Sequence, residues 1–199
     1  QYDRPRQTQP AHRPSHAGTG LGQPNEHRRE QPEGPGGPQR LKDMQFSSLL
    51  ILCEANICRS PLAEHILRSL TGLTVTSAGL SARTGDPADP VYLEMAKELG
   101  IDLAQHQSRP VNDALVRSAD LTLVMTSGHK RRLSERYPQF SGKIMRLGHW
   151  THGGVSISDP HRKSVEAYQQ VFKQIQDACD QWSRKLLREQ PNDVNTARR

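Results

Sequence analysis

Short apolar runs alternate with segments of helical spacing from residue 48 to residue 188, and this alternation constrains the fold more than any other feature. The apolar runs lie at residues 48–52, 73–79, 119–125 and 143–147. Runs of this length bounded by turn residues are typical of buried strands, whereas apolar residues three and four apart are typical of helices. The alternation predicts a single α/β domain with a four-stranded parallel sheet, order 2-1-3-4, and helices on both faces.

The helices are placed by their first residues and by the period of their apolar positions. Ser60 is predicted to cap a helix whose first residue is Pro61, because a proline at that position loses no hydrogen bond. Asp89 marks another helix start. The last helix, about residues 163–188, has apolar residues three and four apart, namely Val165, Tyr168, Phe172, Ile175, Cys179, Trp182 and Leu186. We expect it to pack along one side of the sheet.

The two ends of the chain differ in composition from its middle. Residues 1–43 hold 7 Pro, 6 Gly and 6 Arg and no Ile, Val, Met or Phe, so they cannot bury enough apolar surface to offset the entropy of ordering. We therefore predict a disordered tail at 1–43, a folded domain at 44–189 and a flexible tail at 190–199. The chain has no run of about 18 apolar residues, so neither export nor membrane insertion is expected. The three cysteines are expected to be reduced thiols in a cytoplasmic protein.

Net charge gives little information about function. The formal charge of +6 fits an anionic substrate, but it is equally usual for a soluble protein. No basic run with interleaved aromatic residues is present, so no nucleic-acid partner is predicted.

One turn, residues 53–61, combines the features of an anion site with those of a nucleophile. The first apolar run ends at Cys53, which places this thiol at the carboxyl end of a strand, where parallel sheets bind ligands. A tight turn into a helix exposes backbone N–H groups on one side, and Arg59 adds a planar fork that matches two phosphate oxygens. The predicted phosphate-binding residues are Glu54, Ala55, Asn56, Ile57, Cys58, Arg59 and Ser60. The same field favours the thiolate of Cys53, a nucleophile to which Ser60 could donate a hydrogen bond.

Phosphoryl transfer to sulfur also needs an acid that protonates the leaving oxygen. Asp159 is the best candidate, because its loop follows the fourth strand and so leaves the same edge of the sheet as Cys53. The predicted catalytic residues are therefore Cys53, Arg59 and Asp159.

The histidines near Asp159 and the cysteine Cys58 are not among the predicted catalytic residues. His149, His152 and His161 lack the spacing of metal ligands and have no carboxylate cluster beside them in the sequence, so no metal and no cofactor are predicted. His161 is expected at the rim of the pocket. Cys58 is either a bystander or a thiol that traps the oxidised nucleophile as a disulfide.

The segment Cys53-Glu54-Ala55-Asn56-Ile57-Cys58-Arg59-Ser60-Pro61 resembles the signature loop of the low-molecular-weight protein tyrosine phosphatases. Further matches are residues 77–79, 100–102, 148–150 and 159–164 together with His106, Arg109 and Asp120, so that the resemblance covers roughly residues 46–187. It implies a phosphatase in which Cys53 is the nucleophile, Arg59 stabilises the transition state and Asp159 donates the proton. It also implies that Asn56 organises the loop and that Cys58 protects the nucleophile from oxidation.

Two segments carry the resemblance further, to one branch of the family. Residues 148–150 and 159–163 are most similar to bacterial members that dephosphorylate tyrosine kinases of capsule and exopolysaccharide export. The resemblance therefore implies a tyrosine-phosphorylated protein as partner, such as an exopolysaccharide tyrosine autokinase.

Several positions depart from the family pattern. The family usually has glycine at the position of Ala55, and if that backbone must be left-handed, alanine costs about 1–2 kcal/mol. Glu54 stands where most relatives are apolar or neutral, and we expect its side chain to point to solvent. His161 stands where many members have a tyrosine, and Leu80, the other expected rim residue, offers no aromatic wall. We therefore expect weaker stacking on phosphotyrosine than in the eukaryotic branch.

Two other functions stay open. A thiol-coupled arsenate reductase can use the same fold but needs a relay of further cysteines, and beyond the loop pair the chain has Cys179 alone. A non-catalytic phosphotyrosine-binding module would result if Glu54 and Ala55 spoiled the loop. Hydrolysis of an aryl phosphate separates turnover from binding.

Overall fold

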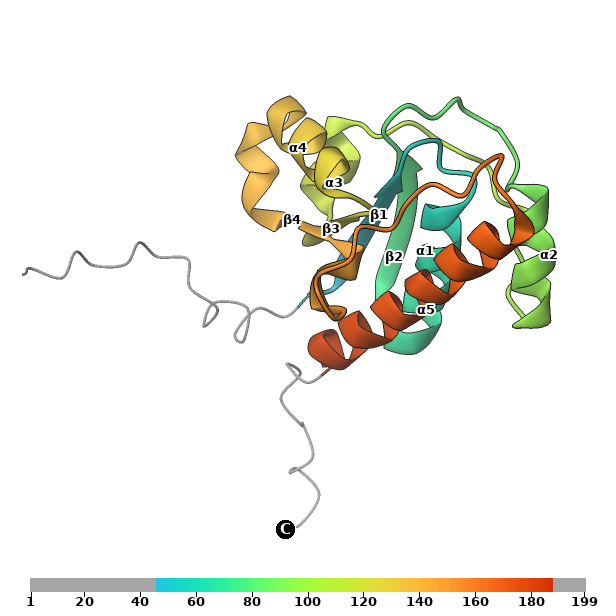
Figure 1. The fold of residues 1–199 in the computed structure, drawn as a ribbon. Coiled ribbons are helices and arrows are strands. Elements are labelled where there is room, and N and C mark those ends of the chain that lie inside the picture. Colours follow the sequence, from blue (N-terminus) through green and yellow to red (C-terminus); the bar gives the residue numbers. More distant parts are fainter. Residues whose placement is uncertain (1–45, 188–199) are drawn as a thin grey trace, which may run out of the picture. The chain divides into compact units, whose positions relative to one another are not determined.

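The sheet has four parallel strands in the order β2-β1-β3-β4, as predicted (Figure 1). The computed structural model describes residues 46–187, so the predictions for 1–43 and 190–199 lie outside the described residues. The strands are β1 (Ser48–Cys53), β2 (Thr74–Gly79), β3 (Leu121–Val124) and β4 (Ile144–Arg146). Strands β2, β3 and β4 are shorter than the apolar runs suggested, whereas β1 extends one residue further, to Cys53.

Strand β1 lies between β2 and β3, and its position fixes the place of the site. Its residues 49–53 are all buried, as expected for a strand covered on both faces. The register pairs Cys53 with Gly79 of β2 and Leu52 with Val124 of β3. The chain leaves β1 toward β2 and later returns to its other side, so the strand order reverses at β1. Ligands in such sheets bind at the carboxyl ends of the strands beside this reversal.

Helices cover both faces of the sheet. On one face lie α1 (Arg59–Thr71) and α5 (Val165–Leu187), with α2 (Pro90–Glu98) beside them, and on the other lie α3 (Asp113–Ser118) and α4 (Ser127–Arg136) (Figure 1). Two short 3-10 helices, Pro138–Lys143 and Leu147–Trp150, flank β4. Tyr92 of α2 packs against Tyr168 and Phe172 of α5, with ring centroids 5.5 and 5.8 Å apart. These contacts hold the start of α2 next to α5.

Two predictions about helices are wrong in detail. Helix α1 begins at Arg59 after Cys58, and the Cys58 side chain does not cap it. The Ser60 hydroxyl instead accepts a hydrogen bond from the Asn56 amide and lies against the Cys53 thiol inside the loop. Val165 is 59% exposed although it continues the apolar stripe of α5. It opens the helix and lines a shallow surface groove with residues of α2, so it does not reach the sheet.

The other positions on the stripe of α5 are buried, Cys179 among them, as predicted. Asp89 caps α2 by accepting from the N–H groups of Val91 and Tyr92. Across residues 46–187, no helix combines the length and the apolar character that a bilayer span requires.

Candidate active site

The Cys53 thiol lies at the end of β1, buried under the turn that leads into α1. The backbone N–H of Asn56 donates to its sulfur at 3.2 Å, and the Ser60 hydroxyl lies 3.0 Å from it. Both groups can stabilise a thiolate by donating hydrogen bonds. A negatively charged sulfur is thus compatible with a site that is otherwise buried.

Asn56 is the residue around which the turn is organised. It adopts the left-handed conformation, with φ of 58°, and its side chain is fully buried. Its amide group donates to the hydroxyls of Ser60 and Ser77 at 3.0 and 2.9 Å, and its side-chain oxygen accepts from the backbone N–H of Arg109 at 3.0 Å. The Asn56 carbonyl lies 2.6 Å from Nε2 of His106. These contacts connect the turn to β2 and to the loop before α3.

The end of β2 approaches the turn so closely that a side chain there would clash. A Cβ atom on Gly79 would lie 2.7 Å from the carbonyl oxygen of Glu54 and 2.9 Å from the carbonyl carbon of Ala55. Gly79 is therefore required by the close approach of the turn.

The backbone strain expected at Ala55 is absent. Ala55 does not have a positive φ, and the left-handed residue of the turn is the next one, Asn56. Asparagine tolerates this conformation better than most residues do, because its short polar side chain can hydrogen-bond locally. Alanine at position 55 therefore carries no left-handed penalty.

The Glu54 side chain does not point freely to solvent, contrary to expectation. Its carboxylate accepts two hydrogen bonds from Arg132 of α4, at 2.8 and 3.2 Å, and Arg132 also donates to the Ser81 hydroxyl. Partial burial would raise the pKa of Glu54, but the hydrogen bonds from Arg132 and Ser81 lower it overall. The pair joins the turn to α4.

His129 of α4 lies against the same carboxylate, with Nε2 3.4 Å from Glu54. Burial, together with the positive charge of Arg59, lowers the pKa of His129. The neutral ring therefore contributes packing rather than a second positive charge.

Arg59 and Asp159 face each other across the mouth of the turn. The Arg59 side chain is 3% exposed and that of Asp159 is 46% exposed, and Nη2 of the arginine pairs with Oδ2 of the carboxylate. Arg59 also donates to the carbonyl of Ile157 at 3.1 Å. The three predicted catalytic side chains thus come together at one edge of the sheet, although 100 residues separate Arg59 from Asp159.

The loop that carries Asp159 is fixed by its neighbours. Ile157 is buried, and its N–H donates to the carbonyl of Met125 just past the end of β3, at 2.9 Å. The backbone N–H of His161 donates to Oδ1 of Asp159 at 3.1 Å. The loop therefore leaves the carboxyl edge of the sheet, as the sequence predicted.

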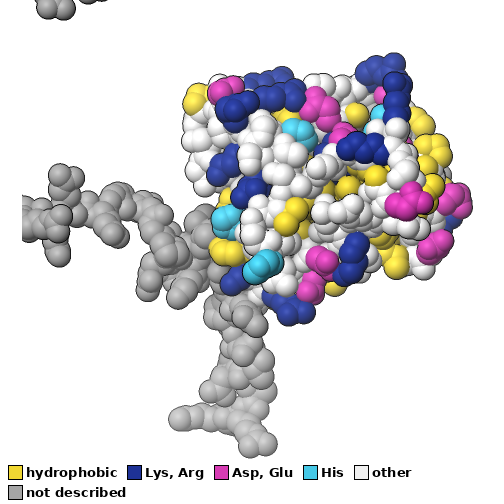
Figure 2. Space-filling model, in the orientation of Figure 1, with side chains coloured by type: hydrophobic (Ala, Val, Ile, Leu, Met, Phe, Trp, Pro, Cys, Tyr) yellow, Lys and Arg dark blue, Asp and Glu magenta, His cyan; other side chains and the backbone are white. Residues whose placement is uncertain are grey.

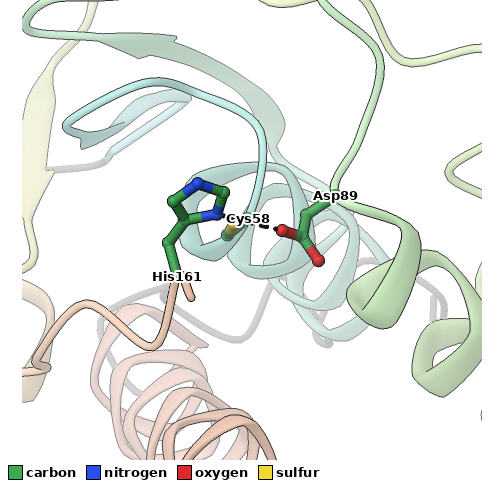
Figure 3. A group of neighbouring side chains, drawn as sticks. All are labelled: Cys58, Asp89 and His161. Carbon is green, nitrogen blue, oxygen red and sulfur yellow. Dashed lines mark hydrogen bonds and ion pairs between the residues drawn. The ribbon is translucent and has the colours of Figure 1, made fainter. Parts of the chain in front are cut away.

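A second group of polar side chains lies beside the turn, where Cys58, Asp89 and His161 approach one another (Figure 3). Nδ1 of His161 lies 3.3 Å from Oδ2 of Asp89, and the Tyr168 hydroxyl donates to the same oxygen at 3.1 Å. Burial, with the negative charge of Asp89 next in importance, raises the pKa of the Cys58 thiol well above its usual range. Cys58 is thus a buried thiol at neutral pH.

The other predicted residues take less central positions. The Leu80 N–H donates to the Cys53 carbonyl at 2.9 Å, while its side chain packs against the core under α3 and α4. Ile57 packs against the core under α1 and α5, and its carbonyl accepts from the Asp89 N–H at 2.8 Å.

Charged side chains are mixed on the face that Figure 2 shows. Lys and Arg side chains lie along its upper edge, the edge toward which the strands run in Figure 1, with acidic side chains among them. This mixture suits an anionic group presented on a larger molecule better than an extended polyanion.

Comparisons with protein families and with known protein sequences point to the same family. The family model described as low molecular weight phosphotyrosine protein phosphatase matches residues 48–192. The chain is 40% identical over 146 residues to the low molecular weight protein-tyrosine-phosphatase Wzb of Escherichia coli strain K12, covering 73% of this chain and 99% of that protein.

Solved structures are similar over the same part of the chain. Wzb of Vibrio vulnificus, solved with benzylphosphonate, matches with a TM-score of 0.68 at 40% identity, over 71% of this chain and 99% of that one. The YwlE arginine phosphatase from Geobacillus stearothermophilus matches with a TM-score of 0.69 at 32% identity, over 75% of this chain and 99% of that one.

Sequence reasoning missed three side chains of this region. Asp89 was interpreted only as a helix cap. Its position before Pro90 gave no sign that Oδ2 of Asp89 contacts Tyr168 and His161. Ser77 was one of several small residues closing a strand. Arg132 lies 78 residues from Glu54 along the chain, and no local pattern connects the two.

Proposed function

Since the chain belongs to the low molecular weight phosphotyrosine protein phosphatase family, it is a protein-tyrosine phosphatase, and we propose that it works through a phosphocysteine formed on Cys53. The observation that carries this proposal is the convergence of three groups at one edge of the sheet. The Cys53 sulfur is hydrogen-bonded within the turn, and Arg59 of the same turn pairs with Asp159 from the loop after β4.

In the first step the phosphate of phosphotyrosine takes the place of Asp159 on Arg59. The guanidinium fork and the N–H groups of the turn hold the equatorial oxygens, a role in which an arginine contributes roughly 10³–10⁵ in rate at other phosphoryl-transfer sites. The Cys53 thiolate then forms the S–P bond as the P–O bond to the tyrosine ring breaks. The Asp159 carboxyl gives its proton to the leaving oxygen, a contribution of about 10²–10⁴.

In the second step water attacks the phosphocysteine. Asp159, now a carboxylate, takes a proton from the water as the P–O bond forms and the S–P bond breaks. Inorganic phosphate leaves and Cys53 returns to the thiolate, which the Ser60 hydroxyl and the Asn56 N–H stabilise.

The substrate we propose is a tyrosine-phosphorylated protein, specifically a tyrosine kinase of exopolysaccharide production. Support comes from the resemblance of residues 148–150 and 159–163 to bacterial members that act on such kinases. It comes also from the similarity to Wzb.

The alternatives find less support in the site. A non-catalytic binding module was suggested by Ala55 and Glu54, but Ala55 is unstrained and Glu54 is held by Arg132. An arsenate reductase needs a further accessible thiol, and Cys179 is buried in the core.

The test compares the full chain with Cys53→Ser, Arg59→Lys and Asp159→Ala on an aryl phosphate, with rapid-quench detection of the covalent intermediate. We expect Cys53→Ser to abolish turnover. Arg59→Lys should lower kcat by about 10³ or more, and Asp159→Ala by about 10²–10⁴. Cys179→Ala, which changes a thiol outside the site, is the matched control and should keep its turnover.

Two results would contradict the proposal: turnover by Cys53→Ser at the parent rate, or the absence of a labelled cysteine in Asp159→Ala during hydrolysis. Phosphoarginine should be assayed beside phosphotyrosine peptides, because one structural neighbour is an arginine phosphatase. Faster hydrolysis of phosphoarginine would overturn the proposed substrate while leaving the phosphocysteine step intact. A pulldown with Asp159→Ala from an exopolysaccharide-producing bacterium should retain the phosphorylated kinase, and its release from the wild-type protein is the control.

A further inference from the structure

Three side chains of metal-binding type meet beside the active-site turn without belonging to the proposed catalytic steps. Cys58 ends the turn, Asp89 caps α2 and His161 lies in the loop before α5 (Figure 3). One ligand atom from each residue lies within 4.8 Å of the other two. The sequence could not show this cluster, because its members come from segments 31 and 72 residues apart.

The carboxylate of the cluster is held in a fixed orientation. Oδ1 of Asp89 accepts from the N–H groups of Val91 and Tyr92, at 3.0 and 3.4 Å. Oδ2 is thereby directed to the Tyr168 hydroxyl and to Nδ1 of His161, at 3.1 and 3.3 Å. Such an arrangement is typical of metal sites, in which hydrogen bonds from neighbouring residues orient the ligands.

The spacing and chemistry fit zinc. Zn²⁺ binds nitrogen and oxygen at about 2.0–2.2 Å and thiolate sulfur at about 2.3 Å, so neighbouring ligand atoms of a tetrahedral site lie roughly 3.3–3.7 Å apart. The 3.3 Å between Nδ1 of His161 and Oδ2 of Asp89 already has this value. Zinc accepts thiolate, imidazole and carboxylate together, whereas magnesium and calcium prefer oxygen alone.

We propose that Cys58, Asp89 and His161 bind a Zn²⁺ ion, and that the bound ion inhibits the phosphatase. The Cys58 thiol releases its proton to solvent as the Zn–S bond forms, and no electrons are transferred. The His161 side chain is 45% exposed, so it offers an entry path to the two buried ligands. The fourth position is left to water or to an anion.

Inhibition follows from where the ligands are attached. The His161 N–H donates to Asp159, and Cys58 directly precedes Arg59. An ion that joins His161 to Asp89 and Cys58 fixes the loop in which Asp159 pairs with Arg59. A substrate phosphate must displace Asp159 from Arg59, so this fixed state excludes it. This consequence for turnover rests on the proposed function.

The binding test uses Co²⁺ in place of zinc, because a thiolate bound to cobalt gives an absorption band that is read without turnover. The chain has three cysteines, so the band can be assigned by substitution. We expect the full chain and Cys53→Ser to show the band, and Cys58→Ser to lose it. A band that survives in Cys58→Ser and disappears in Cys53→Ser would overturn the proposal, because the metal would then be bound by the nucleophile.

The inhibition test titrates Zn²⁺ against aryl phosphate hydrolysis and expresses each rate relative to the same variant without metal. Loss of a residue that only hydrogen-bonds to a ligand typically weakens metal binding by about 10–100-fold. Loss of a direct ligand in His161→Ala should therefore raise the inhibitory zinc concentration at least about tenfold. His152→Ala, an exposed histidine outside the cluster, is the matched control and should keep the parent sensitivity. Equal sensitivity of His161→Ala and the parent would refute the site, and because His161 is at the surface, its variant should fold.

Discussion

The left-handed conformation of Asn56 predicts that glycine is more stable than alanine at position 56 but less stable than alanine at the neighbouring position 55. Asn56→Ala and Asn56→Gly both remove three buried hydrogen bonds made by the side chain. At about 1 kcal/mol for each bond, both variants should lose roughly 3 kcal/mol of unfolding free energy.

The two variants should differ because of the backbone alone. An alanine in the left-handed region costs about 1–2 kcal/mol, which glycine avoids, although glycine loses about 0.5–1 kcal/mol more in backbone entropy. Asn56→Gly should therefore be more stable than Asn56→Ala by roughly 0.5–1 kcal/mol. At Ala55, where φ is not positive, glycine brings only the entropic cost, so Ala55→Gly should be about 0.4–1 kcal/mol less stable than the parent.

Urea unfolding at equilibrium, followed by the fluorescence of Trp150 and Trp182, measures all three differences. If Asn56→Gly is no more stable than Asn56→Ala, the conformation of Asn56 is not left-handed in solution and the prediction is wrong. If Ala55→Gly stabilises the protein, the strain lies at position 55 instead, which also contradicts the prediction.

Two further predictions concern charged groups away from the nucleophile. Partial burial would raise the pKa of Asp120, but hydrogen bonds from Ser47 and Ser48 lower it overall. The Asp120 carboxylate therefore stabilises the fold fully above its unfolded pKa of about 3.9. This stabilisation is lost as the pH falls through the lower pKa of the folded state. Urea midpoints of Asp120→Asn and the parent should differ most near neutral pH and converge below about pH 4, and a constant gap would contradict the assignment. The pair of Glu54 with Arg132, which is partly exposed, should give a coupling of about 0.2–1 kcal/mol in a double-mutant cycle of Glu54→Gln and Arg132→Gln. Raising the salt to about 0.5 M, roughly three times physiological ionic strength, should weaken this coupling, and a coupling that stays unchanged would argue against an ion pair.

Local signals placed most of the elements correctly. The last helix, expected at about residues 163–188, runs from Val165 to Leu187, and Asp89 caps α2 as expected, because capping and period depend on residues a few positions apart. The prediction of Ser60 as a cap was wrong for a tertiary reason. The Ser60 hydroxyl has buried partners in Cys53 and Asn56, and the local sequence at the helix start does not reveal these contacts.

The sequence by itself determined the parallel α/β fold, the turn from Cys53 to Pro61 and the edge of the sheet at which Asp159 would lie. These follow from periodicity and from the rule that consecutive parallel strands end at the same edge. Only the tertiary structure decided which side chains meet there across long separations. Glu54 meets Arg132, the strain falls on Asn56 rather than Ala55, and His161 reaches Cys58 and Asp89. Such contacts depend on how the loops at the carboxyl edge pack against one another, and no local pattern of residues encodes that packing.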